Sequence, residues 1–209
     1  MTRTRLPNRG LYAITDGPRA GLLDAVAQAL AGGVRLLQYR DKTADTTRRH
    51  AEAVALKRLC DVHGAPLIVN DDVALAAAVS AAGVHLGRDD GDVAAARAVL
   101  GDGAIIGVSC YDSRALADAA VKAGADYVAF GAFFPSPTKP HAVRASLELL
   151  RQSAALGVPR VAIGGITPDN APSLVEAGAD FLAVVSAVFG ADDVRAAAQR
   201  FARLYPSSD

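Results

Sequence analysis

The stretch from Gly131 to Lys139 carries side chains that could hold an anion. It reads Gly-Ala-Phe-Phe-Pro-Ser-Pro-Thr-Lys and follows the apolar run Tyr127 to Phe130. Its prolines fix φ and lack an N–H, so the stretch can neither continue a strand nor enter a helix. We therefore expect a stiffened loop that presents Ser136, Thr138 and Lys139 to an anionic ligand. In isolation, the same pattern also fits a Pro-rich connection whose polar residues only face water.

A second group of polar side chains follows the apolar run that ends near Tyr39. Gln38, Arg40 and Lys42 are two residues apart, and the period of an extended chain sends them to one side. An amide beside two cations suits a diphosphate. The alternative is a solvated strand exit with ordinary charges.

Carboxylates follow the next two apolar runs, in Asn70-Asp71-Asp72 and in Gly87-Arg88-Asp89-Asp90. If these runs are neighbouring strands, carboxylates from both loops can approach one ion. Hard oxygen ligands without a His or Cys pattern favour Mg²⁺, and we assign Asp71 and Asp90 as its ligands. Capping of the following helices is the alternative, and one aspartate of each pair could cap while the other coordinates.

Further polar groups end three later apolar runs. Ser109 closes the run 104–109, although a serine there is also a common start of a helix. Gly164-Gly165 follows the run 160–163, and Ser186 follows the run 181–185, whose last residue is Val185. Glycines let backbone N–H groups approach a ligand closely, and helix N-termini attract anions, so these last two places predict a phosphate cradle.

The remaining reactive residue types do not form a catalytic group. Cys60 and Cys110 lack a CxxC spacing and are expected to be core residues, with a reactive role for Cys110 as the alternative. His85 lies within an apolar run and is expected to be a satisfied buried histidine rather than a base. No Ser-His-Asp, Cys-His or paired-Glu pattern is present.

The elements that must position these residues alternate between short β-rich runs and Ala-rich helical patterns. Such alternation requires parallel strands joined by right-handed crossovers, and eight units favour closure into a barrel. We therefore expect one (β/α)8 TIM barrel domain over residues 1–209, with the chemistry at the carboxyl ends of the strands. An open doubly wound sheet is the alternative. The expected strands are 11–15, 34–39, 66–70, 83–86, 104–109, 127–130, 160–163 and 181–185. The expected helices are 22–31, 44–63, 72–81, 93–100, 113–123, 144–156, 168–176 and 192–204.

A short motif recurs before the even-numbered strands of this barrel. It reads Ala-Gly-Gly-Val at 31–34, Ala-Ala-Gly-Val at 81–84, and Ala-Gly-Ala-Asp at both 123–126 and 177–180. Each glycine suits a left-handed position that ends a helix. The repeat indicates that the same strand and helix unit occurs along the whole chain.

Composition limits the partners of such a barrel. The 209 residues carry zero formal net charge, so no chain-wide basic field exists for nucleic acid or an anionic membrane. No apolar stretch reaches the roughly 18 residues of a membrane span, and no apolar leader follows the first residues. We expect a cytoplasmic protein that binds small molecules. The oligomeric state stays open, a homo-oligomer included.

Taken together, these motifs resemble those of the thiamine phosphate synthase family along almost the whole chain. The resemblance implies that Arg40, Ser109 and Lys139 act in catalysis and that Mg²⁺ lies on Asp71 and Asp90. It implies that the substrates are an aminomethylpyrimidine diphosphate and a thiazole phosphate. Diphosphate would leave first, and the thiazole nitrogen would capture the resulting pyrimidine methyl cation. The implied pyrimidine diphosphate ligands are Gln38, Arg40, Lys42, Asn70, Ser109 and Lys139; the implied thiazole phosphate ligands are Ser136, Thr138, Gly165, Val185 and Ser186.

The chain departs from the commonest family pattern at a few positions. Asp41 stands in place of Glu and Ser136 in place of Thr, and both substitutions keep the functional group. Arg88-Asp89 replaces Gln-Glu, which adds a cation near the expected metal. A related thiazole tautomerase relies on a His where this chain has Tyr111. The alternatives are therefore such a tautomerase, a phosphosugar isomerase or epimerase, and a sensor that binds phosphate ligands without catalysis.

Overall fold

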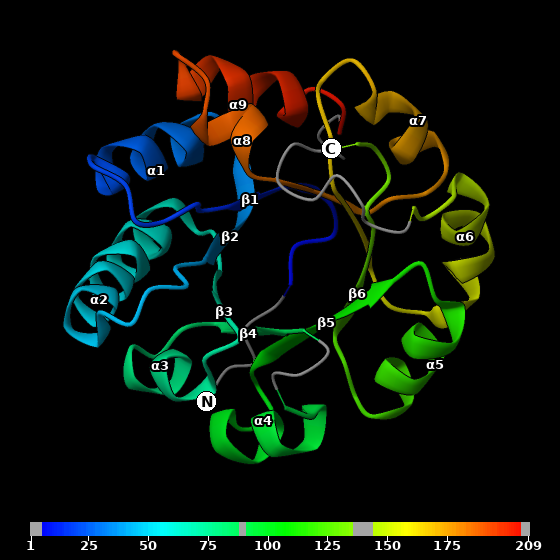
Figure 1. Ribbon diagram of the computed structural model, residues 1–209, viewed down its shortest axis with the longest axis horizontal. Helices are drawn as coiled ribbons and strands as arrows, with labels where there is room; N and C mark the ends of the chain where they lie inside the picture. Colours follow the sequence, from blue (N-terminus) through cyan, green and yellow to red (C-terminus); the bar gives the residue numbers. More distant parts are fainter. Residues whose placement is uncertain (1–5, 88–90, 136–143, 206–209) are drawn as a thin grey trace.

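The strands of this protein close into a barrel. The computed structural model describes residues 6–87, 91–135 and 144–205. Within them, eight parallel strands pair in the order of the chain, and the last strand pairs with the first. Figure 1 shows the helices following one another around this barrel. The predicted (β/α)8 architecture is therefore confirmed, and the open doubly wound sheet is excluded.

The observed strands agree with the expected ones more closely than the observed helices do. The strands are β1 (Gly10–Ile14), β2 (Val34–Tyr39), β3 (Leu67–Asn70), β4 (Gly83–Leu86), β5 (Ile105–Tyr111), β6 (Tyr127–Phe130), β7 (Arg160–Ile163) and β8 (Phe181–Val184). The helices are α1 (Leu22–Ala31), α2 (Thr46–His63), α3 (Val73–Ala78), α4 (Val93–Leu100), α5 (Arg114–Lys122), α6 (Leu147–Gln152), the 3₁₀ helix η1 (Ser153–Leu156), α7 (Ala171–Glu176), α8 (Ser186–Phe189) and α9 (Val194–Ala202). The short α8, directly after β8, was not predicted.

Helix starts follow from single polar residues. In several helices an Asp or Ser side chain at the N-cap accepts a hydrogen bond from the backbone N–H three residues later, which satisfies a donor that the helix leaves free. These caps are Asp45, Asp72, Asp92, Ser113, Ser146 and Asp193. The caps fix where each loop at the carboxyl ends of the strands stops and the helix begins.

The recurring glycine motif serves two different purposes. Gly33, Gly124 and Gly178 have φ values of 100°, 95° and 95°, which is the left-handed conformation predicted for them. The prediction is wrong for Gly83, which is the first residue of β4 and has no left-handed φ. A Cβ on Gly83 would lie 1.7 Å from the carbonyl oxygen of Ile105, so only glycine allows β4 and β5 to pair this closely.

Strand residues are buried on both faces of the barrel wall, as expected for a parallel sheet that is covered by helices. One cluster lies between the wall and the helices. A second, smaller cluster fills the barrel interior. Its largest fully buried members are Tyr12, Leu36, Ile68, Tyr127 and Phe181.

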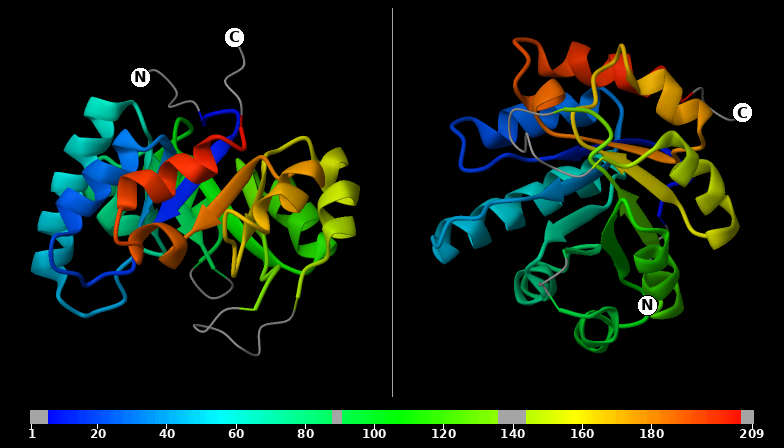
Figure 2. Two further views of the ribbon diagram at one scale, coloured as in Figure 1. Left: turned by 90° about the horizontal axis from the view of Figure 1, so that it is seen from above. Right: turned by 45° about the vertical axis from the view of Figure 1, so that its right-hand side comes forward.

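The two ends of the described chain lie at the end of the barrel where the strands begin. The guanidinium of Arg9 lies 5.1 Å from the ring centroid of Tyr205, which joins the start of β1 to the end of α9. In the left view of Figure 2, the arrows of β1 and β8 point away from this end. The carboxyl ends of the strands, where barrel enzymes carry their chemistry, are therefore at the opposite end. Among the described helices, none is long and apolar enough to cross a membrane.

Candidate active site

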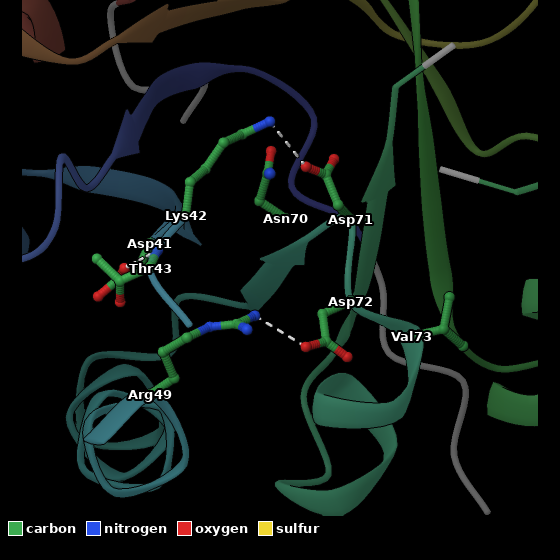
Figure 3. A pocket seen from close by; sticks show the side chains of 8 residues that line it. All are labelled: Asp41, Lys42, Thr43, Arg49, Asn70, Asp71, Asp72 and Val73. Atoms are coloured by element: carbon green, nitrogen blue, oxygen red, sulfur yellow. Dashed lines mark hydrogen bonds and ion pairs between the residues drawn. The ribbon is translucent and has the colours of Figure 1, made fainter. Parts of the chain in front are cut away.

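A polar pocket lies where β2 and β3 end. Its volume is about 570 Å³. Figure 3 shows Lys42, Asn70 and Asp71 pointing into the same space, with Arg49 and Asp72 on another side of it. Three residues that the sequence analysis singled out are therefore brought together. The residues that line the pocket are Asp41, Lys42, Thr43, Arg49, Asn70, Asp71, Asp72 and Val73.

An ion pair joins the exits of these two neighbouring strands. The ammonium of Lys42 lies 3.2 Å from a carboxylate oxygen of Asp71. Asp71 has a left-handed φ of 63°, which Asp tolerates better than most residues, and its N–H donates to the carbonyl of His85 on β4 at 2.9 Å. A strained backbone that is held by a neighbouring strand is typical of a functional position.

The neighbouring aspartate has a different role. One carboxylate oxygen of Asp72 accepts the N–H of Leu75 at 2.8 Å and so caps α3, while the other accepts from Arg49 at 2.8 Å. Of this pair, therefore, Asp72 caps the helix and Asp71 faces the pocket. The cap of α4 is Asp92, whose side chain accepts from Ala95 at 2.7 Å. The sequence analysis considered Asp89 and Asp90 as caps of α4, but Asp92 has that role.

The sequence analysis assigned no role in this pocket to Arg49 or Asp41. Arg49 extends from α2, and its Nε is buried without a hydrogen-bond partner among the described residues. Asp41 is buried, and its carboxylate accepts the N–H of Thr43 at 2.8 Å and lies 2.9 Å from the guanidinium of Arg48. The run Thr46-Thr47-Arg48-Arg49 places both arginines in the first turn of α2, and this was the available signal.

The surroundings of Asp41 predict a particular pH dependence of stability. Burial acts to raise the pKa of this carboxyl, but the backbone and hydroxyl of Thr43 and the charge of Arg48 outweigh it, so the pKa is lowered. Asp41→Asn should therefore lower the free energy of unfolding by about 1 kcal/mol at neutral pH. This difference should persist down to about pH 4, the ordinary pKa of Asp, and disappear as the pH falls through the lowered value.

Urea unfolding of both proteins between pH 2 and pH 7 measures this difference. An equal stability of the two proteins at neutral pH would contradict the assignment, as would a difference that stays constant down to pH 2.

Gln38 and Arg40 lie deeper than Lys42. The Gln38 side chain is inside the barrel, 2% exposed, and donates to the hydroxyl of Tyr12 at 2.6 Å. Arg40 is half-buried, and its backbone N–H donates to the hydroxyl of the buried Thr15 at 2.8 Å. The hydroxyl of Thr15 in turn donates to the Arg40 carbonyl at 3.2 Å, so β1 fixes the backbone at the exit of β2.

Ser109 faces the barrel interior from β5. Its hydroxyl lies 2.9 Å from Nε2 of His85, and the cap of the following helix is Ser113, so Ser109 does not start that helix. The pairing of β5 with β6 shifts register around Cys110, which is a bulge after Ser109. Cys110 is buried, and burial raises the pKa of its thiol to about 12. Because the thiolate is the reactive form, this favours the expected core role over a reactive one.

Gly164 and Gly165, after β7, pack against the loop that follows β6. Both have a left-handed φ, 103° and 64°. A Cβ on Gly165 would lie 2.4 Å from the carbonyl oxygen of Pro135, and one on Gly164 would lie 2.5 Å from Cβ of Ala132. Because Gly164 and Gly165 have no side chains, the loop 131–135 can pack closely against them. The sequence analysis expected these glycines to admit a ligand and did not foresee this contact with the loop. This loop leads directly to Ser136.

The residues expected after β8 differ in exposure. Val185 is half-buried against the interior cluster of the barrel. Ser186 begins α8 and is exposed. Asp90, Ser136, Thr138 and Lys139 lie outside the described residues, as do Arg88 and Asp89.

The donor atoms of the pocket fit a hard cation. Asp71 and Asn70 supply oxygen ligands of the kind that Mg²⁺ prefers. Across residues 6–87, 91–135 and 144–205, no three His, Cys, Asp or Glu side chains converge on one point. Mg²⁺ keeps several waters and commonly takes one or two carboxylates together with substrate phosphates. The pocket therefore fits Mg²⁺ that is shared with a phosphate ligand better than a metal in a closed protein cage.

Comparisons with known proteins give one consistent set of relatives for this chain. The model of the family described as thiamine monophosphate synthase matches residues 11–188. The thiamine-phosphate synthase of Chromobacterium violaceum is 60% identical over 92% of this chain and 94% of the relative. That of Nitrosococcus oceani is 55% identical over 95% of this chain and 94% of the relative. Among solved structures, thiamine phosphate pyrophosphorylase from Pyrococcus furiosus superposes with a TM-score of 0.84 at 37% identity, over 94% of this chain and 95% of that one.

Proposed function

Because this chain belongs to the thiamine monophosphate synthase family, we propose that its pocket binds an aminomethylpyrimidine diphosphate beside a thiazole phosphate. Its activity is that of a thiamine-phosphate synthase, a transferase of thiamine biosynthesis. We further propose that the reaction needs Mg²⁺ and that one domain carries both substrate sites. We also propose that the protein is located in the cytoplasm.

The proposed reaction breaks one bond and forms another at the same carbon. The bond between the pyrimidine methylene carbon and the diphosphate oxygen breaks, and its electron pair leaves with the diphosphate. The thiazole nitrogen then donates its lone pair to the methylene cation, which forms the new carbon–nitrogen bond. Because no proton must be removed from carbon in these steps, the site needs charge and alignment more than a general base.

The charges of the candidate site residues suit a departing diphosphate. We assign Lys42, Arg40 and Lys139 to its oxygens, where cations offset the charge that grows as the bond breaks. Mg²⁺, on Asp71 and Asp90, would add positive charge at the same oxygens when bound. Gln38, Asn70 and Ser109 are assigned to the pyrimidine diphosphate as hydrogen-bonding groups. Ser109, Arg40 and Lys139 are the proposed catalytic residues.

The thiazole phosphate is assigned to the loops after β6, β7 and β8. The loops after the last two strands are the usual phosphate site of this architecture. The contact between Gly165 and the chain at Pro135 supports a site shared by these loops. The proposed ligands are Ser136, Thr138, Gly165, Val185 and Ser186.

The observation that carries this proposal is the pairing of Lys42 with Asp71 across the exits of β2 and β3. A cation and a carboxylate at one pocket are the two groups that a metal diphosphate requires. The test is to mix both substrates with the protein and Mg²⁺ and to follow thiamine phosphate and diphosphate. We expect equal amounts of the two products.

Removal of Mg²⁺ with a chelator should lower the rate of this reaction by at least about 100-fold, because the leaving charge loses its counter-ion. Added Mg²⁺ should restore it, which serves as the control for damage by the chelator. Full activity in the chelator would refute the metal assignment. Absence of thiamine phosphate under all conditions would refute the proposed function.

A further inference from the structure

A chain of hydrogen bonds crosses the barrel interior from Gln38 to Ser109. Nε2 of Gln38 donates to the Tyr12 hydroxyl at 2.6 Å, and that hydroxyl lies 2.8 Å from the Tyr127 hydroxyl. The Tyr127 hydroxyl lies 3.0 Å from Nδ1 of His85, and Nε2 of His85 lies 2.9 Å from the Ser109 hydroxyl. The five side chains come from five strands, β2, β1, β6, β4 and β5.

The pairing of the strands brings the side chains of this hydrogen-bond chain together. His85, Gly107 and Tyr127 are successive partners on β4, β5 and β6, so they lie at one level of the wall. Because Gly107 has no side chain, the rings of His85 and Tyr127 meet in front of it, stacked with centroids 5.6 Å apart. A Cβ on Gly107 would lie 1.9 Å from Cζ of Tyr127. The chain therefore depends on a glycine at this place.

The chemistry of the groups gives the chain one direction. The Gln38 nitrogen can only donate, so the Tyr12 oxygen accepts from it and directs its own proton to Tyr127. Tyr127 then directs its proton to Nδ1 of His85. Both hydroxyls are buried, and a buried hydroxyl proton without an acceptor would be costly. In the neutral imidazole the remaining proton is on Nε2, which donates to Ser109 and leaves the Ser109 proton available for a ligand.

We propose that Tyr12, Tyr127 and His85 are positioning residues, which carry a one-way chain of hydrogen bonds from Gln38 and present the Ser109 hydroxyl as a donor to the pyrimidine diphosphate. This inference rests on the proposed function, which places Gln38 and Ser109 at that substrate. It adds three residues that do not line the pocket. Apolar side chains of the same size would fill the same space but would leave Ser109 free to turn its proton away.

The first test is the tautomer of His85, measured by ¹⁵N NMR of histidine-labelled protein and assigned with a His85→Gln variant. We expect the proton on Nε2 in the wild type. In Tyr127→Phe, the Nδ1 resonance should shift toward that of a ring nitrogen without a hydrogen bond. The matched control is Tyr205→Phe, which removes a buried hydroxyl that donates to the Ala179 carbonyl and has no part in the hydrogen bonds from Gln38 to Ser109. A proton on Nδ1 in the wild type would overturn the proposal, as would an unchanged Nδ1 resonance in Tyr127→Phe.

The second test is kinetic and separates positioning from stability. Tyr127→Phe should raise KM for the pyrimidine diphosphate by about 10-fold, the effect of one misdirected hydrogen bond, and leave KM for the thiazole phosphate unchanged. Kinetic constants equal to those of Tyr205→Phe would overturn the positioning role. If the wild type forms no thiamine phosphate, the proposed function fails, and the NMR test still decides whether the chain has the proposed direction.

Discussion

Asp71→Asn should lower kcat of thiamine phosphate formation by about 10² to 10³-fold. The substitution keeps the shape of the side chain but removes the charge that faces Lys42 and the pocket. Loss of one group that stabilises developing charge in a transition state has effects of this size. The fold should remain, because the Asp71 side chain is partly exposed, at 24%, and caps no described helix. Steady-state kinetics with saturating Mg²⁺ measures the loss.

The adjacent residue offers a matched control. Asp72→Asn removes the same charge one position along, but asparagine caps a helix as well as aspartate does. The lost ion pair with Arg49 should cost no more than about 1 kcal/mol of stability. We therefore expect kcat within about threefold of the wild type. Equal losses of activity in the two variants would show that the pocket needs only its total charge, and Asp71 would lose its assigned role.

Gly165→Ala should lower turnover by about 100-fold while the barrel remains folded. The new Cβ would lie 2.4 Å from the Pro135 carbonyl oxygen and 2.7 Å from that of Phe134, so the loop after β6 must move. A displacement of about 1 Å at a substrate-positioning loop can cost a factor of this order. We expect a loss of about 1–3 kcal/mol in the free energy of unfolding from the clash and the left-handed φ.

Gly157→Ala is the matched control for this substitution. Gly157 has a similar φ of 72°, but a Cβ there would meet no atom within 4 Å. It should therefore show the cost of the left-handed backbone alone, about 1 kcal/mol, with normal turnover. Kinetics and urea unfolding of both variants separate the two effects. Normal turnover in Gly165→Ala would mean that the loop contact does not position the substrates.

The barrel could be predicted from the sequence because each strand is short, apolar and followed by a helix with its own signals. The strands were placed to within two residues. The helices were less well placed at their ends, since a helix can start at any of several polar residues in a loop. Asp89, Asp90 and Asp92 all precede α4, and only the backbone decides that Asp92 is its cap.

The sequence predicted only part of where the candidate site residues lie. Alternation with a period of two holds only while the chain stays extended, so it could not show that Gln38 lies inside the barrel whereas Lys42 reaches the pocket. The division of roles between Asp71 and Asp72 depends on one left-handed backbone position, which the sequence does not mark. The hydrogen bond between the Tyr12 and Tyr127 hydroxyls joins residues that are 115 positions apart in the sequence. Because both resemble ordinary core aromatics there, nothing in the sequence indicated this bond.

We infer that Asp71 and the neighbouring cations form a site for a metal diphosphate. Calorimetric titration of the protein with inorganic diphosphate, with and without Mg²⁺, tests this most directly. We expect binding that requires Mg²⁺, weakens by at least about 10-fold in Asp71→Asn and is unchanged in Asp72→Asn. Equal affinity for diphosphate in all three proteins, whether or not Mg²⁺ is present, would contradict the account.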